Sequence, residues 1–231
     1  MFAVCGVADA KDPEPPTVRF EHDMMVRFHM HENFDLLRAI EKLLLRGKRD
    51  EATALARAIS EAPNEPGLGE LAVHAIRVRD LAAALARAPS IDAACAREAR
   101  LAVACAGCHT ATGVMPVLSS VPALPPDKST IEARMARHVW ATDRLWEAAV
   151  SGGDEPWAKG LEVLSAAPLP FRASMDGRSA LAKQLQRLAS TALKRKTTDS
   201  LNERGRAYGE ILAVCATCHM ASSATSVPNQ K

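Results

Sequence analysis

Apolar residues recur at intervals of three and four positions along most of the chain. This spacing places them on one face of an α-helix. Prolines and glycines interrupt the pattern and mark the ends of the helical segments. The expected helices span approximately residues 18–46, 49–62, 68–88, 90–105, 129–151, 154–167, 174–196 and 199–216. The chain is therefore predicted to be all-α.

A proline-rich stretch near the middle of the chain separates two halves that repeat each other. At a shift of 105 residues, Met30 aligns with Met135 and Gly47 aligns with Gly152. Four amphipathic helices in each half are typical of an antiparallel four-helix bundle. We expect two such bundles in tandem. The expected boundaries are 1–17 for a signal-peptide remnant and extended lead-in, 18–115 for bundle one, 116–128 for the linker and 129–231 for bundle two.

The composition agrees with this fold class and excludes one class of partner. Hydrophobic residues make up 48% of the chain but aromatic residues only 4%, a balance that favours helices over sheets. The formal net charge is +2, and basic residues are interspersed with acidic ones. Because nucleic-acid binding needs a concentrated basic surface, we expect no nucleic-acid partner.

Two copies of one short motif carry the candidate chemistry. They are Cys105-Ala-Gly-Cys108-His109 and Cys215-Ala-Thr-Cys218-His219. This C-x-x-C-H spacing is the attachment signature of a c-type haem, in which both thiols bond to the porphyrin and the histidine ligates the iron. A dithiol redox motif and a zinc site are alternatives, but zinc would need two further ligands near each cysteine pair. We therefore expect two covalently attached haem c groups. Cys95, outside both motifs, is expected to be a small core residue.

The position of the motif indicates which cytochrome type the chain resembles. Each copy lies at the end of the last predicted helix of its half, and only a short segment follows His219. This arrangement resembles the class II c-type cytochromes, the cytochrome c-prime group. The resemblance covers about residues 18–110 and 129–220, and its specific part is the motif and its placement. It implies two four-helix bundles, each with the haem on its last helix and the sixth iron position facing its first helix.

The first helix of each half offers candidates for that sixth ligand. Met30 and Met135 occupy the same repeat position, and Arg27-x-x-Met30 resembles the family's Arg-x-x-Met approach to the ligand. His138 lies one helical turn after Met135 and is the alternative in half two. His29 is the alternative in half one. Both methionines could instead be core filler on an amphipathic helix.

The resemblance implies an exported, periplasmic dihaem cytochrome that carries electrons between redox partner proteins, including a membrane-associated respiratory complex. Neither half shows paired carboxylates or an activated nucleophile, so we expect no enzymatic activity. The rival interpretation is a nitric oxide or carbon monoxide binder with at least one five-coordinate haem. Export also agrees with Ala8-Asp9-Ala10, which resembles a signal-peptide cleavage site. Cys5 is a candidate for lipid attachment, although Val4 is unfavourable at that position.

Overall fold

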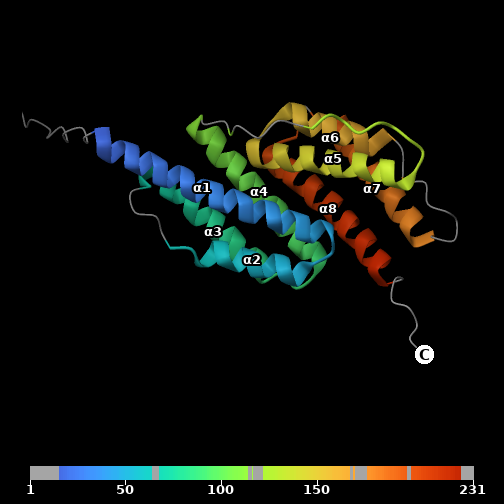
Figure 1. The fold of residues 1–231 in the computed structure, drawn as a ribbon, viewed down its shortest axis with the longest axis horizontal. Coiled ribbons are helices and arrows are strands. Elements are labelled where there is room, and N and C mark those ends of the chain that lie inside the picture. The colour runs from blue at the N-terminus through green and yellow to red at the C-terminus, as the bar shows by residue number, and fades with distance from the viewer. Residues whose placement is uncertain are drawn as a thin grey trace, which may run out of the picture.

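The computed structural model describes residues 16–63, 68–113, 116, 122–166, 169, 176–196 and 199–224. Every regular element in these ranges is helical, which confirms the all-α prediction (Figure 1). The first half contains α1 (Pro16–Leu45), α2 (Arg49–Glu61), the short 3-10 helix η1 (Gly69–Leu71), α3 (Ala72–Ala86) and α4 (Ile91–Thr112). The second half contains α5 (Ile131–Ser151), α6 (Asp154–Ala166), α7 (Asp176–Lys194) and α8 (Leu201–Ala224).

The last helix of each half extends through its C-x-x-C-H motif. The expected end of α8 at Ala216 is wrong, because the helix continues to Ala224. The helix α4 continues through Gly107 and ends at Gly113, which adopts a left-handed φ of 70°. The motif residues are therefore held on a regular helical backbone in both halves.

Helices that follow one another in the chain pack against one another, so each half folds back and forth on itself. The first turns of α1 and the last turns of α4 lie at one end of the molecule, at the left of Figure 1. The start of α5 and the last turns of α8 lie toward the opposite end. The buried apolar side chains of the two halves form one continuous core. Division of the chain into two separate domains stays a prediction.

The most extensive helix contact within the described residues joins α4 to α8. Small residues allow this close approach. A Cβ atom at Gly209 would lie 3.3 Å from the Ala99 Cβ and 3.4 Å from the Cys95 carbonyl oxygen. One at Gly205 would lie 3.4 Å from the Ala99 carbonyl oxygen. The later residue on α8 thus contacts the earlier residues on α4, so the two helices are antiparallel. Cys95 is fully buried at this crossing, which confirms it as a small core residue.

Equivalent positions of the repeat meet each other in the contact between the halves. The Arg38 Nη2 on α1 donates to the Asp143 Oδ1 on α5, and these residues are separated by the repeat shift of 105 positions (143 − 38). Arg38 also lies over the ring of Trp146, with 4.4 Å between Cζ and the ring centroid. Contacts between equivalent positions indicate a two-fold relation between the halves, as in an isologous dimer.

We predict that Gly209→Leu will lower the free energy of unfolding by about 1–3 kcal/mol or more, because overpacking must separate α4 from α8. Chemical denaturation of the purified protein measures this change. Gly177→Leu is the control, since a Cβ at Gly177 meets nothing within 4 Å. Equal stability of the two variants would contradict the proposed close packing.

Candidate functional site

The two thiols and the histidine of each motif lie on one side of a continuous helix. Cys105, Cys108 and His109 stand at relative positions 0, 3 and 4 of α4, a spacing that aligns side chains on one helical face. His109 is buried, whereas both cysteines are partly exposed. Neither thiol forms a disulfide. The first motif can therefore present two thiols and one imidazole to the same bound group.

The second motif repeats this arrangement on α8. Cys215, Cys218 and His219 are all partly exposed, and neither thiol forms a disulfide. Burial lowers the pKa of His219, and the nearby Arg46 guanidinium lowers it further. A neutral imidazole at physiological pH is the form that ligates a metal ion.

The thiols do not have the electrostatic environment of a reactive dithiol. Burial raises the pKa of Cys105 to about 12 and that of Cys215 to about 12. Burial also raises the pKa of Cys108 and Cys218. Reactive cysteines of C-x-x-C redox motifs instead have a lowered pKa. This difference argues against a dithiol redox function for either motif.

Each motif lies against the first interhelical turn of the other half. A Cβ at Gly152, in the α5–α6 turn, would lie 3.7 Å from the Ala106 Cβ inside the first motif. A Cβ at Gly47, in the α1–α2 turn, would lie 3.3 Å from the Ala216 carbonyl oxygen inside the second motif. The sequence did not predict these contacts, which make each motif dependent on both halves.

Large apolar side chains are exposed on the helices that pack against α4 and α8, and on α8 itself. In the first half, these side chains are Met24, Phe28 and Met30 on α1 and Val73 and Ile76 on α3. In the second half, they are Ile131 and Val139 on α5 and Met220 on α8. A flat apolar group bonded to the cysteines could cover such side chains and remove them from water. The residues present therefore fit a porphyrin at each motif.

The candidate sixth ligands lie on α1 and α5. The first turns of α1 lie at the same end of the molecule as the last turns of α4, and the first turns of α5 lie toward the same end as the last turns of α8 (Figure 1). Met30 on α1 is 41% exposed, and Met135 on α5 is half-buried. His138 on α5 is buried, and desolvation lowers its pKa to about 4, with Arg134 adding to the effect. His29 lies on α1, but its side chain is outside the described part of the structure.

Within the part of the chain that the structure describes, no group of three or more His, Cys, Asp or Glu side chains is arranged to hold a metal ion by itself. None of the helices in the described ranges combines the length and hydrophobicity needed to cross a membrane.

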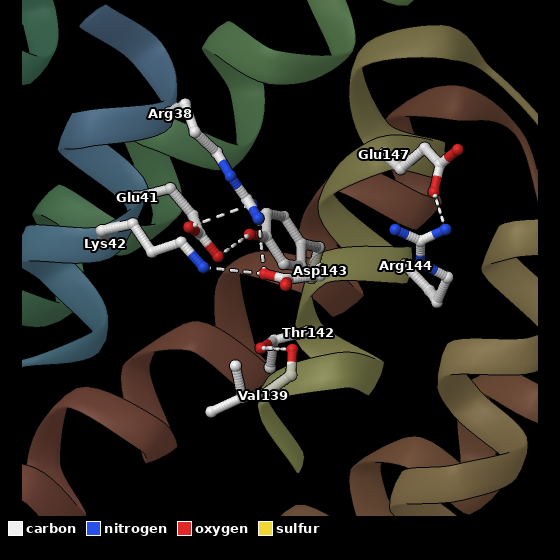
Figure 2. A network of polar contacts seen from close by, with 9 residues as sticks. Arg38, Glu41, Lys42, Val139, Thr142, Asp143, Arg144 and Glu147 are labelled. Atoms are coloured by element: carbon white, nitrogen blue, oxygen red, sulfur yellow. Dashed lines mark hydrogen bonds and ion pairs between the residues drawn. The ribbon is translucent and has the colours of Figure 1, made fainter. Parts of the chain in front are cut away.

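A buried polar cluster lies between the two motif-bearing helices, and sequence analysis missed it. Glu41 on α1, Glu98 on α4 and Tyr208 on α8 are all fully buried. The Tyr208 hydroxyl donates to the Glu41 Oε1 at 3.3 Å. The Arg38 Nη1 donates to the Glu41 Oε2 at 3.2 Å, and Figure 2 shows how these groups connect to Asp143. The sequence does carry a signal for this cluster, because Glu98 and Tyr208 each precede the first cysteine of a motif by seven residues.

The repeat relates the members of this cluster to one another. Glu41 corresponds to Trp146 (41 + 105), and Glu98 corresponds to Tyr208 (98 + 110). The Glu41–Tyr208 hydrogen bond therefore has a counterpart pair in Trp146 and Glu98. The Trp146 indole N–H favours ionised Glu98, but neither carboxyl oxygen has a partner at hydrogen-bond distance. Because an unpaired buried charge is very unfavourable, Glu98 is expected to be a neutral acid.

Burial also controls the ionisation of both glutamates. Desolvation raises the pKa of Glu41 to about 7, against the lowering effects of Arg38 and Lys42. Desolvation, followed by the charge of Glu41, raises the pKa of Glu98 well above its usual range.

Comparison with protein-family models, curated proteins and solved structures finds no significant match to this chain.

We predict that Glu41 and Glu98 make the free energy of unfolding of the haem-free protein fall as pH rises from about 5 to 8. The lowered pKa of His138 acts in the opposite direction below about pH 6.5. Both glutamates bind protons more tightly in the folded state, so their contribution is complete below pH 4.5 and is lost at higher pH. For Glu41 this loss continues up to about pH 7 and is on the order of 3 kcal/mol, at 1.36 kcal/mol per pKa unit.

Denaturant titrations at several pH values test this prediction. Glu41→Gln and Glu98→Gln should each reduce the slope of stability against pH, and the exposed Glu51→Gln should not. A slope of stability against pH that is the same in Glu41→Gln and Glu98→Gln as in the wild type would contradict the burial of neutral acids.

Proposed function

We propose that this protein is a dihaem c-type cytochrome that carries electrons between redox partner proteins. One observation supports this most directly. Each C-x-x-C-H motif presents its three side chains on one face of a helix, and large apolar side chains are exposed on the helices that pack against it. On this proposal, each half is a haem-binding four-helix bundle of the cytochrome c-prime kind.

The motif residues hold the two haems. Cys105 and Cys108 form the thioether bonds of the first haem, and His109 is its proximal iron ligand. The corresponding residues of the second haem are Cys215, Cys218 and His219. When bound, each haem supplies an iron centre that exchanges one electron. Burial of Cys105 and Cys215 keeps these thiols protonated and protects them from disulfide exchange before attachment.

We assign Met30 and Met135 as the sixth iron ligands, with His138 and His29 as the alternatives. A closed coordination shell suits a carrier, because electron transfer then requires little rearrangement of ligands. His138 has one property in its favour: it is buried and neutral at physiological pH, which suits an iron ligand. A histidine at this position would lower the reduction potential of the second haem relative to methionine ligation.

The second candidate function is binding of nitric oxide or carbon monoxide at the first haem. The 41% exposure of Met30 favours it, because an exposed thioether is less firmly held near the iron than a packed one. Under either function, haem attachment implies export to the periplasm. The partners of a carrier would be other redox proteins, including a membrane-associated respiratory complex.

We predict two covalent haems per chain when the protein is produced together with a haem-attachment system. Mass spectrometry after acid–acetone extraction measures the added mass. Cys105→Ala with Cys108→Ala should leave one haem, and Cys215→Ala with Cys218→Ala should leave the other. Cys95→Ala is the matched control and should retain both. Protein with no added haem, or with zinc in place of haem, would refute the proposed function.

We predict that Met135→Ala, and not His138→Ala, will abolish the methionine–iron absorption band of the second haem. Met30→Ala should do the same for the first haem. Oxidised visible spectra of the single variants measure these losses. Loss of axial ligation in His138→Ala would instead assign the second haem to histidine. A native high-spin spectrum with full carbon monoxide binding at both haems would favour the gas-binding function.

A further inference from the structure

Glu41 is buried where four helices from both halves meet. Its carboxyl group accepts a hydrogen bond from Tyr208 on α8 and one from Arg38 on α1. Glu98 on α4 interacts with it electrostatically, as does Asp143 on α5. Two acids at such a depth are unusual, since carboxyl groups are seldom fully buried unless they are paired.

The two buried acids are within electrostatic range of the haem attachment points. Tyr208, the hydrogen-bond partner of Glu41, lies two helical turns before Cys215 on α8, and Glu98 lies two turns before Cys105 on α4. Each attachment cysteine therefore lies near a different glutamate. Because screening is weak inside a protein, a change in the charge of either haem would shift the pKa of the nearer glutamate.

A chain of polar groups connects Glu41 with the protein surface. The Arg38 guanidinium bridges Glu41 and Asp143, and the Lys42 Nζ donates to the Asp143 Oδ1 at 2.8 Å. Arg38, Lys42 and Asp143 are all partly exposed. Figure 2 shows these side chains extending from Glu41 across the gap between α1 and α5. These ion-paired groups place the Glu41 cluster near solvent at the α1–α5 contact, the side from which water can supply a proton.

We propose that Glu41 is a proton-binding site coupled to electron transfer, so that the protein takes up a proton when the second haem accepts an electron. This inference rests on the proposed dihaem function. The electron comes from a redox partner protein and reduces ferric iron to ferrous iron. The proton comes from water and converts the Glu41 carboxylate to the neutral acid. On oxidation, the electron leaves to an acceptor protein and the proton returns to water.

The direction of the coupling follows from charge. An added electron removes one positive charge from the haem, which makes ionised Glu41 less favourable and raises its pKa relative to the oxidised protein. Proton uptake therefore accompanies reduction between the oxidised-state pKa and the reduced-state pKa. Within that window, the reduction potential falls as pH rises. Outside it, Glu41 contributes no pH dependence.

The groups around Glu41 make it, rather than Glu98, the site that titrates near neutral pH. Arg38 and Lys42 on α1 lower the pKa of Glu41, whereas Asp143 on α5 raises it. The Tyr208 hydrogen bond from α8 also lowers it. Among the described residues, Arg38 is the cation that lowers the pKa of Glu98, and burial outweighs it, so we expect Glu98 to keep its proton in both redox states.

Potentiometric titration of the dihaem protein at pH values from 6 to 9 tests the proposal. Full coupling changes the reduction equilibrium tenfold per pH unit, which is about 59 mV for a one-electron couple. We expect at least a threefold change per pH unit for one haem in the wild type. Glu41→Gln should abolish this dependence, and the exposed Glu51→Gln should retain it.

A second variant separates titration from structural disturbance. Tyr208→Phe removes the hydrogen bond that lowers the pKa of Glu41, so the pH window should move to higher pH and remain present. Infrared difference spectra should show a protonated carboxyl band that appears on reduction and is missing in Glu41→Gln. Correctly loaded protein whose potentials do not depend on pH, or depend on it equally in Glu41→Gln, would overturn this inference alone. Failure of haem attachment would instead refute the proposed function on which it rests.

Discussion

The antiparallel crossing of α4 and α8 is the contact on which the rest of the structure depends. Gly205 and Gly209 allow the two backbones to approach closely, and Ala99 and Cys95 present equally small surfaces on α4. The crossing joins the cores of both halves and directs the C-terminal ends of the two helices to opposite ends of the molecule (Figure 1). Separation of the motifs is therefore a consequence of backbone packing at one point.

The repeat has diverged at the contact between the halves. A symmetric pair of identical halves would place Arg38 against a second arginine, and like charges in contact are unfavourable. In this chain, Asp143 stands at the equivalent position and forms an ion pair with Arg38. Glu98 and Tyr208 are likewise equivalent but chemically different. These differences place the ionisable Glu41 beside a hydroxyl donor and within electrostatic range of Cys215, the attachment point of only one proposed haem.

Local features of the fold could be predicted from sequence, and long-range ones could not. The three- and four-residue apolar spacing determined the eight helices, because amphipathic helices repeat on that scale. The continuation of α8 beyond Ala216 was missed because no apolar pattern marks the motif. The contact of Gly209 with Ala99 has no local signature, since small residues also occur singly in many helices. In the sequence, Glu41 has the pattern of an exposed residue that forms an ion pair with Arg38, three positions earlier. Its burial is evident only from the tertiary structure.

The distance between the two irons tests the central claim most directly. His109 and His219 each lie ten residues beyond Ala99 and Gly209, the contact point of the crossing. At 1.5 Å per residue, antiparallel helices separate these histidines by roughly 25–30 Å. Pulsed electron paramagnetic resonance of the oxidised protein should therefore detect two ferric haems that interact weakly over a distance of that order. A single haem per chain, or two strongly coupled haems in direct contact, would contradict the account.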